Sequence, residues 1–510
     1  MPSTKKLLRQ EWTTFRRPGR LIAMAAAALV VLALGLLYAA GNHASCDGSC
    51  ATDPRGPDGS PVSDQFFFLH RDLGENGSIT VRMTSMTGTV TYPPPGHDQI
   101  VSGLVPWAKA GIIIKDGVRR GSSYAALMLT GSHGVRMQHD YRHDVAGRTG
   151  GVSAQSPRWL RLTRSGDTIT GYESDDGKQW AKVGTAKLSG LPPTVQVGLF
   201  ATSPGDMTLR RTGLGGATEQ TRFTQAGGVF DHVSLKGTDP AQGWSSEAVG
   251  EMNRSDWEKY HKASEAVVGT NGTITVTGIG DIGPTGTEGG LPVERTLTGL
   301  TVALLIVLVV AVRFAGAGHH REPTGGAPVT RQVLAAKATV VGAVTFLTGL
   351  LAVGTVIPVG LAILRANGMP VIAVSTSTGV RVVVGTAAVL ALAAVLALAL
   401  GATLRRAWLA ILVAVSAVVV PYAVAAVPLL PDGLSQWLLR VTPAAGFAAQ
   451  QTLTEYPQVI AHYAPSAGYF PLPWWAGIAV LCAYTVIALG LALRRLPRSD
   501  ERAAQPVDWR

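Results

Sequence analysis

Apolar positions gather in long uninterrupted runs at the two ends of the chain. Six such runs contain no Asp, Glu, Lys or Arg: Leu21–Gly41, Thr296–Val312, Ala338–Leu364, Val382–Leu404, Ala407–Leu430 and Pro473–Leu493. About 20 apolar residues suffice for a helix to cross the hydrocarbon core, and a charge inside such a helix is costly. The pattern predicts six transmembrane helices, with kinks at Pro358 and Pro421.

Between the first apolar run and the second, the sequence has no long apolar runs, and apolar residues alternate with polar ones. Short stretches such as Ser78–Ser85 and Val195–Ala201 alternate apolar and polar residues. Tight turns are expected at Ser165–Gly166 and Asp176–Gly177, because glycine accepts the positive φ that hairpins need. This pattern predicts a β-sandwich over residues 63–237.

The remaining segments complete the expected domain organisation. In residues 1–20, Leu8, Trp12 and Phe15 share one helical face, which favours an interfacial helix over a frayed basic tail. Residues 42–62 are expected to be a linker, residues 238–295 a membrane-proximal extension with a flexible return, and residues 495–510 a tail. The first span is 21–41 and the five-span part 296–494. The fold class is therefore mixed: a six-span α-helical membrane domain with an all-β sandwich outside it.

The amino-acid composition also indicates that one part of the chain lies in lipid and another part in water. Of the 510 residues 46% are hydrophobic and only 15% are charged, which indicates that lipid surrounds part of the molecule. The net charge of +11 does not form a stripe with interleaved aromatic residues, so nucleic acid is not an expected partner. Basic residues instead flank the apolar runs at residues 5–20, 313–337, 405–406 and 494–498. The positive-inside rule then predicts cytoplasmic termini and extracytoplasmic residues 42–295.

The first run also has features of a signal peptide, with a basic start and small residues at Ala39–Ala40. Its length favours an uncleaved anchor. Just beyond it, Cys46 and Cys50 are candidates for a small disulfide. Free thiols and a metal site are the alternatives, although no third cysteine outside the spans could complete a metal site.

The chain offers no energy source of its own. No ionisable residue interrupts the six apolar runs, and no Gly-rich loop followed by Lys and Ser or Thr is present to bind ATP phosphates. A transported substrate would therefore need energy from another polypeptide. No catalytic residue, metal site or cofactor is predicted on this chain, and no acidic motif marks a glycosidase pair.

Several segments resemble the permease subunit of bacterial type-2 ATP-binding-cassette (ABC) exporters. They are the amphipathic start Leu7–Arg17, the third-span opening Val333–Ala338, the fourth span Val382–Arg406, and the external segment Leu429–Gln451 before the sixth span. The resemblance implies a bacterial plasma-membrane location, a second permease half in a homo- or heterodimer, and a cytosolic ATPase that holds the ATP. Candidate ATPase-coupling residues are Glu11, Arg16, Arg321, Glu322 and Arg331. Simple positive-inside anchoring is the alternative for these charges. The turn at His319–Gln332, which contacts the ATPase in that family, is short and lacks a clear amphipathic helix.

The outer domain resembles a concanavalin-like jelly-roll family at Trp107–Gly117, Trp159–Leu162 and Ser174–Trp180. Relatives of that family often bind carbohydrate, which implies a glycan or peptide as ligand. The candidate contacts are Trp107, Lys109, Trp159, Arg161 and Trp180. Tryptophan in strands is more often core, so that interpretation stays open. His139, Asp140, His143 and Asp144 have the composition of either a polar hairpin or a metal site.

Three functions follow as hypotheses. The leading one is an exporter permease subunit that is not itself an enzyme. The second is a membrane-anchored glycan- or peptide-binding protein without transport activity. The third is a membrane-bound enzyme acting on cell-wall polysaccharide, which would need a carboxylate pair in the outer domain.

Overall fold

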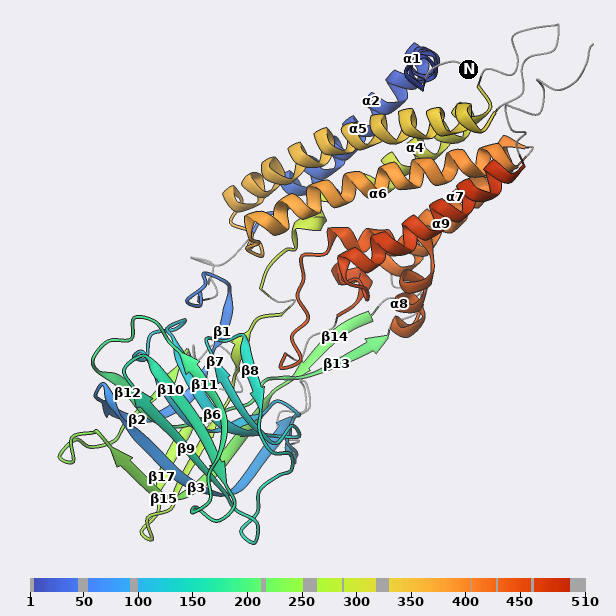
Figure 1. Cartoon of the computed structure of the whole chain (residues 1–510). Coiled ribbons are helices and arrows are strands. Elements are labelled where there is room, and N and C mark those ends of the chain that lie inside the picture. Colours follow the sequence, from blue (N-terminus) through green and yellow to red (C-terminus); the bar gives the residue numbers. More distant parts are fainter. Residues whose placement is uncertain are drawn as a thin grey trace, which may run out of the picture.

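The computed structural model describes residues 4–44, 54–91, 100–211, 217–250, 264–286, 289–317, 330–404, 406–427, 430–459 and 463–495. It consists of a helical bundle and a sheet-rich domain that lies at one end of the bundle (Figure 1). The helix α1 and the last turn of α9 lie at the other end. The mixed fold class is confirmed at this level.

The helical part contains α1 (Thr4–Phe15), α2 (Pro18–Gly41), η2 (Val293–Leu297), α4 (Leu300–Ala315), α5 (Arg331–Ala366), α6 (Thr376–Thr403), α7 (Ala407–Ala426), α8 (Asp432–Val441), η3 (Pro443–Gln450), η4 (Pro465–Ala467) and α9 (Trp474–Arg494). Five of the described helices are long and apolar enough to cross a membrane: α2, α5, α6, α7 and α9. These helices indicate a multi-pass membrane protein.

The sixth expected span coincides with a shorter helix. The helix α4 has 16 residues, which at a rise of about 1.5 Å per residue gives about 24 Å. The hydrocarbon core is about 30 Å thick. Most of the α4 side chains are buried against α2, α5, α6 and α7, so this helix lies at the centre of the bundle. Six full-length spans are therefore not confirmed, because the second apolar run folds as a short central helix preceded by the 3₁₀ turn η2.

Two helices begin earlier than the apolar runs predict. The helix α5 starts at Arg331, where the Thr330 side chain caps it by accepting a hydrogen bond from the Val333 N–H. Ser375 caps α6 in the same way, by accepting from the Thr378 N–H. Lys337 and Arg381 consequently lie on these helices, just outside the runs from which charges were excluded.

Two antiparallel sheets face each other in the sheet-rich domain. Their orders are β11-β10-β9-β3-β15-β18-β17, with β4 on β3, and β16-β2-β12-β5-β6-β7-β8. The core between them takes Ile79, Val81 and Leu160 from the first sheet and Ile112 and Leu199 from the second. The arrangement is that of a β-sandwich.

The strands are β1 (Val62–Asp64), β2 (Phe66–Leu73), β3 (Asn76–Thr91), β4 (Ile100–Ser102), β5 (Lys109–Lys115), β6 (Tyr124–Thr130), β7 (Val135–His139), β8 (His143–Ala146), β9 (Arg158–Ser165), β10 (Thr168–Ser174), β11 (Ala181–Lys187), β12 (Val195–Thr202), β13 (Asp206–Arg211), β14 (Ala217–Arg222), β15 (Thr224–Lys236), β16 (Ser245–Val249), β17 (Glu265–Val268), β18 (Ile274–Gly278) and β19 (Ile282–Pro284).

The predicted sandwich ends at residue 237, but strands that follow this residue also belong to the sheets. Strand β16 pairs with β2, β18 pairs with β15, and β19 pairs with β1. The described strands within residues 238–295 therefore belong to the sheet-rich domain instead of forming a separate extension. Their apolar residues, such as Ile274 and Val276, are buried in the core, but they are too few per strand to stand out in the sequence.

The two predicted turns occur as expected. Gly166 and Gly177 have φ of 57° and 71°, a region that other residues seldom adopt. Beside Gly177, the Asp176 carboxylate accepts hydrogen bonds from the backbone N–H groups of Lys178 and Gln179. These hydrogen bonds lower the pKa of Asp176 to about 2.

Candidate functional site

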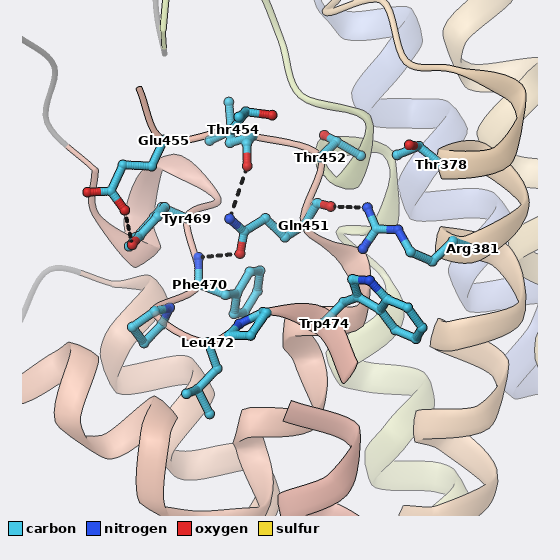
Figure 2. Close-up of a pocket in the computed structure, with 13 residues that line it drawn as sticks. Thr378, Arg381, Gln451, Thr452, Thr454, Glu455, Tyr469, Phe470, Leu472 and Trp474 are labelled. Carbon is cyan, nitrogen blue, oxygen red and sulfur yellow. Dashed lines mark hydrogen bonds between the residues drawn. The ribbon is translucent and has the colours of Figure 1, made fainter. Parts of the chain in front are cut away.

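A pocket of about 630 Å³ lies beside the start of α6, which is the end of that helix nearer the sandwich (Figure 1). Figure 2 shows the residues that line it. We call it the mouth pocket. The start of α6, the segment 451–455 and the segment 469–474 that leads into α9 form its walls. Its lining residues are Thr378, Arg381, Gln451, Thr452, Leu453, Thr454, Glu455, Tyr469, Phe470, Pro471, Leu472, Pro473 and Trp474.

Arg381 supplies positive charge at the side of this pocket that α6 forms. Its Nη2 donates to the Gln451 carbonyl at 2.6 Å, and the guanidinium lies 5.9 Å from the centre of the Trp474 ring. Gln451 in turn accepts from the Phe470 N–H at 3.2 Å and donates to the Leu453 carbonyl at 3.0 Å. These contacts fix the cation and the polar wall before any ligand binds.

Two carboxyl groups lie around the same pocket in different environments. Glu455 is exposed and accepts a hydrogen bond of 2.6 Å from the Tyr469 hydroxyl. Burial, together with this carboxylate, raises the pKa of Tyr469 to about 12, so the phenol stays protonated at neutral pH. Glu294, just before α4, accepts a hydrogen bond of 2.6 Å from the Thr452 hydroxyl.

Glu294 titrates near neutrality. Burial raises the pKa of its carboxyl from 4.5 to about 7, against the opposing hydrogen bond from Thr452. Its Oε1 is buried and has no hydrogen-bond partner within the described part of the chain. The contact therefore joins the start of the central helix α4 to the pocket wall through a group that changes charge between mildly acidic and neutral pH.

The mouth pocket therefore combines a fixed cation, an aromatic wall and two prolines. An arginine beside an indole suits a ligand that carries an anionic group next to an apolar part.

Three of the coupling candidates are described by the structure, and they lie at the opposite end of the bundle (Figure 1). Glu11 is buried on α1, and burial raises the pKa of its carboxyl although Lys337 and Arg20 oppose the shift. Arg16 is exposed just after α1, and Arg331 begins α5. Arg321 and Glu322 lie outside the described residues.

Contacts around Glu11 fasten α1 to the bundle. Phe15 is fully buried and meets Phe314 of α4 edge-to-face, with 5.0 Å between ring centres. The Lys337 Nζ donates to the carbonyls of Phe314, Ala315 and Ala317, at 3.3, 3.1 and 2.6 Å. Lys337 therefore satisfies the free carbonyls at the end of α4, where a cation is favoured by the helix dipole.

Two of the ligand candidates are buried. Trp107 is 6% exposed and stacks on the His133 ring at 4.1 Å. Lys109 is fully buried, and its Nζ lies 2.5 Å from the Asp281 carboxylate and 2.6 Å from the Ile282 carbonyl. Both side chains are occupied by structural contacts.

The other three candidates share the outer face of the first sheet. Leu160 and Leu162 of β9 point into the core, so Trp159 and Arg161 point away from it. The Arg161 guanidinium lies 3.8 Å from the centre of the Trp180 ring. The structure therefore brings Trp159, Arg161 and Trp180 onto one partly exposed surface.

The remaining candidates are the possible metal ligands of the β7–β8 hairpin and the two cysteines. His139 and His143 stack with 4.3 Å between ring centres on the β7–β8 hairpin, and Asp144 pairs with Arg136. Among the residues that the structure describes, no group of three or more His, Cys, Asp or Glu could hold a metal ion. Cys46 and Cys50 fall outside the described residues.

Sequence reasoning missed the mouth pocket. Arg381 precedes the fourth apolar run by one residue, and Glu294 precedes the second by two. A charged residue at the edge of a span is ordinarily an anchor, so neither stood out. The segment 451–474, with its clustered aromatic residues and prolines, was the available signal.

Comparisons with known proteins identify no family for this chain. No family model matches, and no curated protein matches significantly. Some solved structures match part of the chain. A functionally unknown protein from Saccharomyces cerevisiae matches at 18% identity over 38% of this chain and 84% of that one, with a TM-score of 0.22. Scytalido-glutamic peptidase matches at 8% identity over 42% and 98%, with a TM-score of 0.28. The glycosidase-family GH43 protein BlXynB from Bacillus licheniformis matches at 16% identity over 32% and 28%, with a TM-score of 0.20.

One expectation from the sequence is contradicted by these matches. The chain was expected not to be an enzyme, whereas scytalido-glutamic peptidase and the related peptidase SCP-B are enzymes. The exclusion of catalytic activity is withdrawn. The TM-scores are too low to assign a fold or a reaction to this chain.

Proposed function

We propose that this chain is a permease subunit of a type-2 ABC exporter, driven by a separate cytosolic ATPase and paired with a second permease half. In this proposal the apolar run Thr296–Val312, most of which is α4, forms the sixth span, so both termini lie in the cytoplasm of a bacterial cell. The outer domain is a concanavalin-like sandwich that binds substrate, a glycan or a partner as the substrate leaves.

The contact between α1 and the bundle carries the proposal. A permease without its own ATP site needs a cytoplasmic element that transmits force to its spans. The helix α1 supports that role, because Phe15 is buried against α4 and Glu11 lies near Lys337 of α5. Beside this contact, Trp12 is 42% exposed and Arg16 is exposed.

The mouth pocket supports an exit for the substrate. It lies at the far end of the bundle from α1, beside the sandwich, and it presents Arg381 and Trp474 to a ligand. A substrate with an anionic group next to an apolar part fits this lining.

Affinity purification of the tagged chain in mild detergent tests the proposal. We expect an ABC ATPase to co-purify, with ATP hydrolysis in the purified complex. The double variant W12A/R16E changes only exposed side chains in α1 and just after it, and should reduce ATPase recovery by more than tenfold. The matched control is R494E, which reverses an exposed charge at the same end of the bundle.

Recovery of the chain without any ATPase would count against an exporter. Equal recovery with W12A/R16E and with R494E would remove α1 as the coupling element.

A second function is favoured by the surface of Trp159, Arg161 and Trp180. A guanidinium stacked on an indole next to a second indole forms a platform on which a sugar ring or a peptide side chain can stack. A membrane-anchored glycan- or peptide-binding protein would use this surface alone. Loss of glycan or peptide binding in W180A, with an unchanged ATPase partner, would separate the two functions.

A further inference from the structure

A second cavity, of about 820 Å³, lies between the start of α2 and the last turns of α4. We call it the α2–α4 groove. Its wall is apolar, from Ala23, Leu305, Ile306, Val309 and Val310. Its rim carries three arginines, Arg17, Arg20 and Arg313.

The three arginines converge from separate elements. Arg17 precedes Pro18, which starts α2 and forces a break after α1. Arg20 is held in place, because its Nη1 donates to the Thr14 carbonyl at 2.6 Å and its guanidinium lies 5.1 Å from the Phe314 ring. Arg313 lies in the last turn of α4.

The charge of this rim is not neutralised by the protein. Arg17 and Arg313 are exposed, and within the described part of the chain neither has an acidic partner. Glu11 near Arg20 is buried, and burial raises the pKa of its carboxyl. The rim therefore presents a net positive charge directly above an apolar wall.

The groove opens toward the surface that faces lipid. Leu21 and Ile22 of α2 are 40% and 67% exposed, and Val302 of α4 is 43% exposed. Side chains of this kind on a membrane-crossing helix contact acyl chains. A molecule can thus enter the groove from within the bilayer.

We propose that the α2–α4 groove binds an anionic glycerophospholipid. One acyl chain lies along Leu305, Ile306 and Val309, and the phosphate receives hydrogen bonds from the arginines of the rim. Arginine binds phosphate through two parallel N–H donors, and a cationic cluster at a membrane surface attracts anionic lipids. A symmetric second copy of the chain is disfavoured here, because it would bring the same cations together. The inference does not rest on the proposed function.

Native mass spectrometry of the full chain in detergent tests this site. The probes are phosphatidylglycerol and phosphatidylcholine with identical acyl chains. We expect one phosphatidylglycerol to be retained in preference to phosphatidylcholine. Each arginine should contribute about fivefold to the affinity, so the affinity of R17Q/R20Q/R313Q for phosphatidylglycerol should fall by about a hundredfold. The control K5Q/K6Q/R9Q removes the same charge from exposed positions of α1 and should retain the lipid.

A second variant tests the apolar wall without changing charge. V309W fills the groove and should displace phosphatidylglycerol while all three arginines remain. Free glycerol 3-phosphate, added at the same concentration as the lipid, should not compete, since it lacks the acyl chain.

Three results would overturn the proposal. They are equal retention of both lipids, equal loss in the triple variant and in its control, or a dimer that dissociates in V309W with no change in bound lipid. Should the triple variant fail to fold, V309W alone decides between lipid and no lipid.

Discussion

Asp64 and Lys115 form an ion pair that is shut off from solvent inside the outer domain. Both side chains are 0% exposed, and Asp64 also accepts hydrogen bonds from Gly121 N–H and the Tyr141 hydroxyl, at 2.7 and 2.8 Å. Burial lowers the pKa of Lys115 although Asp64 opposes the shift. The pair holds the side of the second sheet that faces away from the main core.

Removing one partner of this pair should destabilise the outer domain. D64N leaves the Lys115 charge buried without its counterion, which costs on the order of 3–5 kcal/mol. Hydrogen exchange of the β5 and β6 amides in the full chain measures the loss. The control is D58N, which removes an ion pair with Arg142 whose side chains are 45% and 40% exposed. That change should cost about 0–1 kcal/mol.

The double variant D64N/K115M removes both charges and should recover part of the loss. Equal exchange rates in D64N and D58N would contradict a stabilising role for the buried pair.

Glu294 should make the stability of the helical part depend on pH. Its pKa is raised in the folded state, to about 7 from 4.5, so the folded chain holds this proton more tightly than the unfolded chain does. The stabilisation is complete below about pH 4.5 and is lost as the pH rises through about 7. Thermal unfolding from pH 4.5 to 8 should show this loss in the native chain and not in E294Q.

The matched control is E455Q, which removes an exposed carboxyl from the same pocket. If the native chain and E294Q lose stability in parallel across this pH range, Glu294 does not control the contact with Thr452.

At the residue scale the sequence predicted turns better than sites. The positive φ at Gly166 and Gly177 follows from local chemistry, and both glycines were identified. Lys109 was taken as a ligand contact, yet its partner Asp281 lies 172 residues away along the chain. No local sequence pattern predicts an ion-pair partner at that separation. A lysine that forms a buried ion pair therefore cannot be distinguished in the sequence from one that is available to a ligand.

At the scale of elements, the buried 3₁₀ helix η3 is packed tightly against α9. All eight of its residues are buried, and Gly477 of α9 lies directly on the Ala445 carbonyl. Irregular backbone within a bundle is tolerated where protein surrounds it. Gly477 permits this close approach because it has no side chain.

G477A should therefore loosen η3 from α9. The added Cβ would lie 2.2 Å from the Ala445 oxygen, and overpacking of this kind costs roughly 1–3 kcal/mol. Thermal unfolding in detergent measures the change. The control G490A lies in the same helix, where an added Cβ meets nothing within 4 Å, and should leave the unfolding temperature unchanged or slightly raised.

An equal effect of G477A and G490A would mean that helix propensity and not packing dominates at Gly477.

Element types were predictable, and element ends were less so. The long apolar runs gave five helices at the expected places, since composition alone decides which segments enter lipid. The helices α5 and α6 begin at the N-caps Thr330 and Ser375, and a hydropathy pattern does not detect capping residues. The strands β16, β18 and β19 are short and pair with distant strands, so their membership of the sheets is a tertiary property.

At the scale of the whole molecule, a side-chain contact joins the sheet-rich domain to the helical part. The Gln458 side chain donates to the Arg142 carbonyl at 3.1 Å, and the Arg142 guanidinium lies 5.9 Å from the centre of the Tyr456 ring. Gln458 lies three residues after Glu455, the last residue of the pocket segment 451–455. This contact connects the β7–β8 hairpin to the pocket wall.

Q458A should increase hydrogen exchange in residues 140–146 and 451–459 together, because one bond orders both segments. The control Q436A removes a similar bond, from Gln436 to the Tyr463 carbonyl, that lies entirely within the helical part. It should leave residues 140–146 unchanged. Faster exchange in only one of the two segments in Q458A would show that they are not ordered by each other.

The pairing of β1 with β19 gives the inserted domain a modular character. Val62 is opposite Pro284, so the chain enters and leaves the domain at adjacent positions about 5 Å apart. A module whose two ends meet can be excised or exchanged by a few linking residues without stretching the host. Descendants of one ancestral bundle could thus differ by gaining or losing a whole outer domain in a single recombination event, while the helices keep their packing.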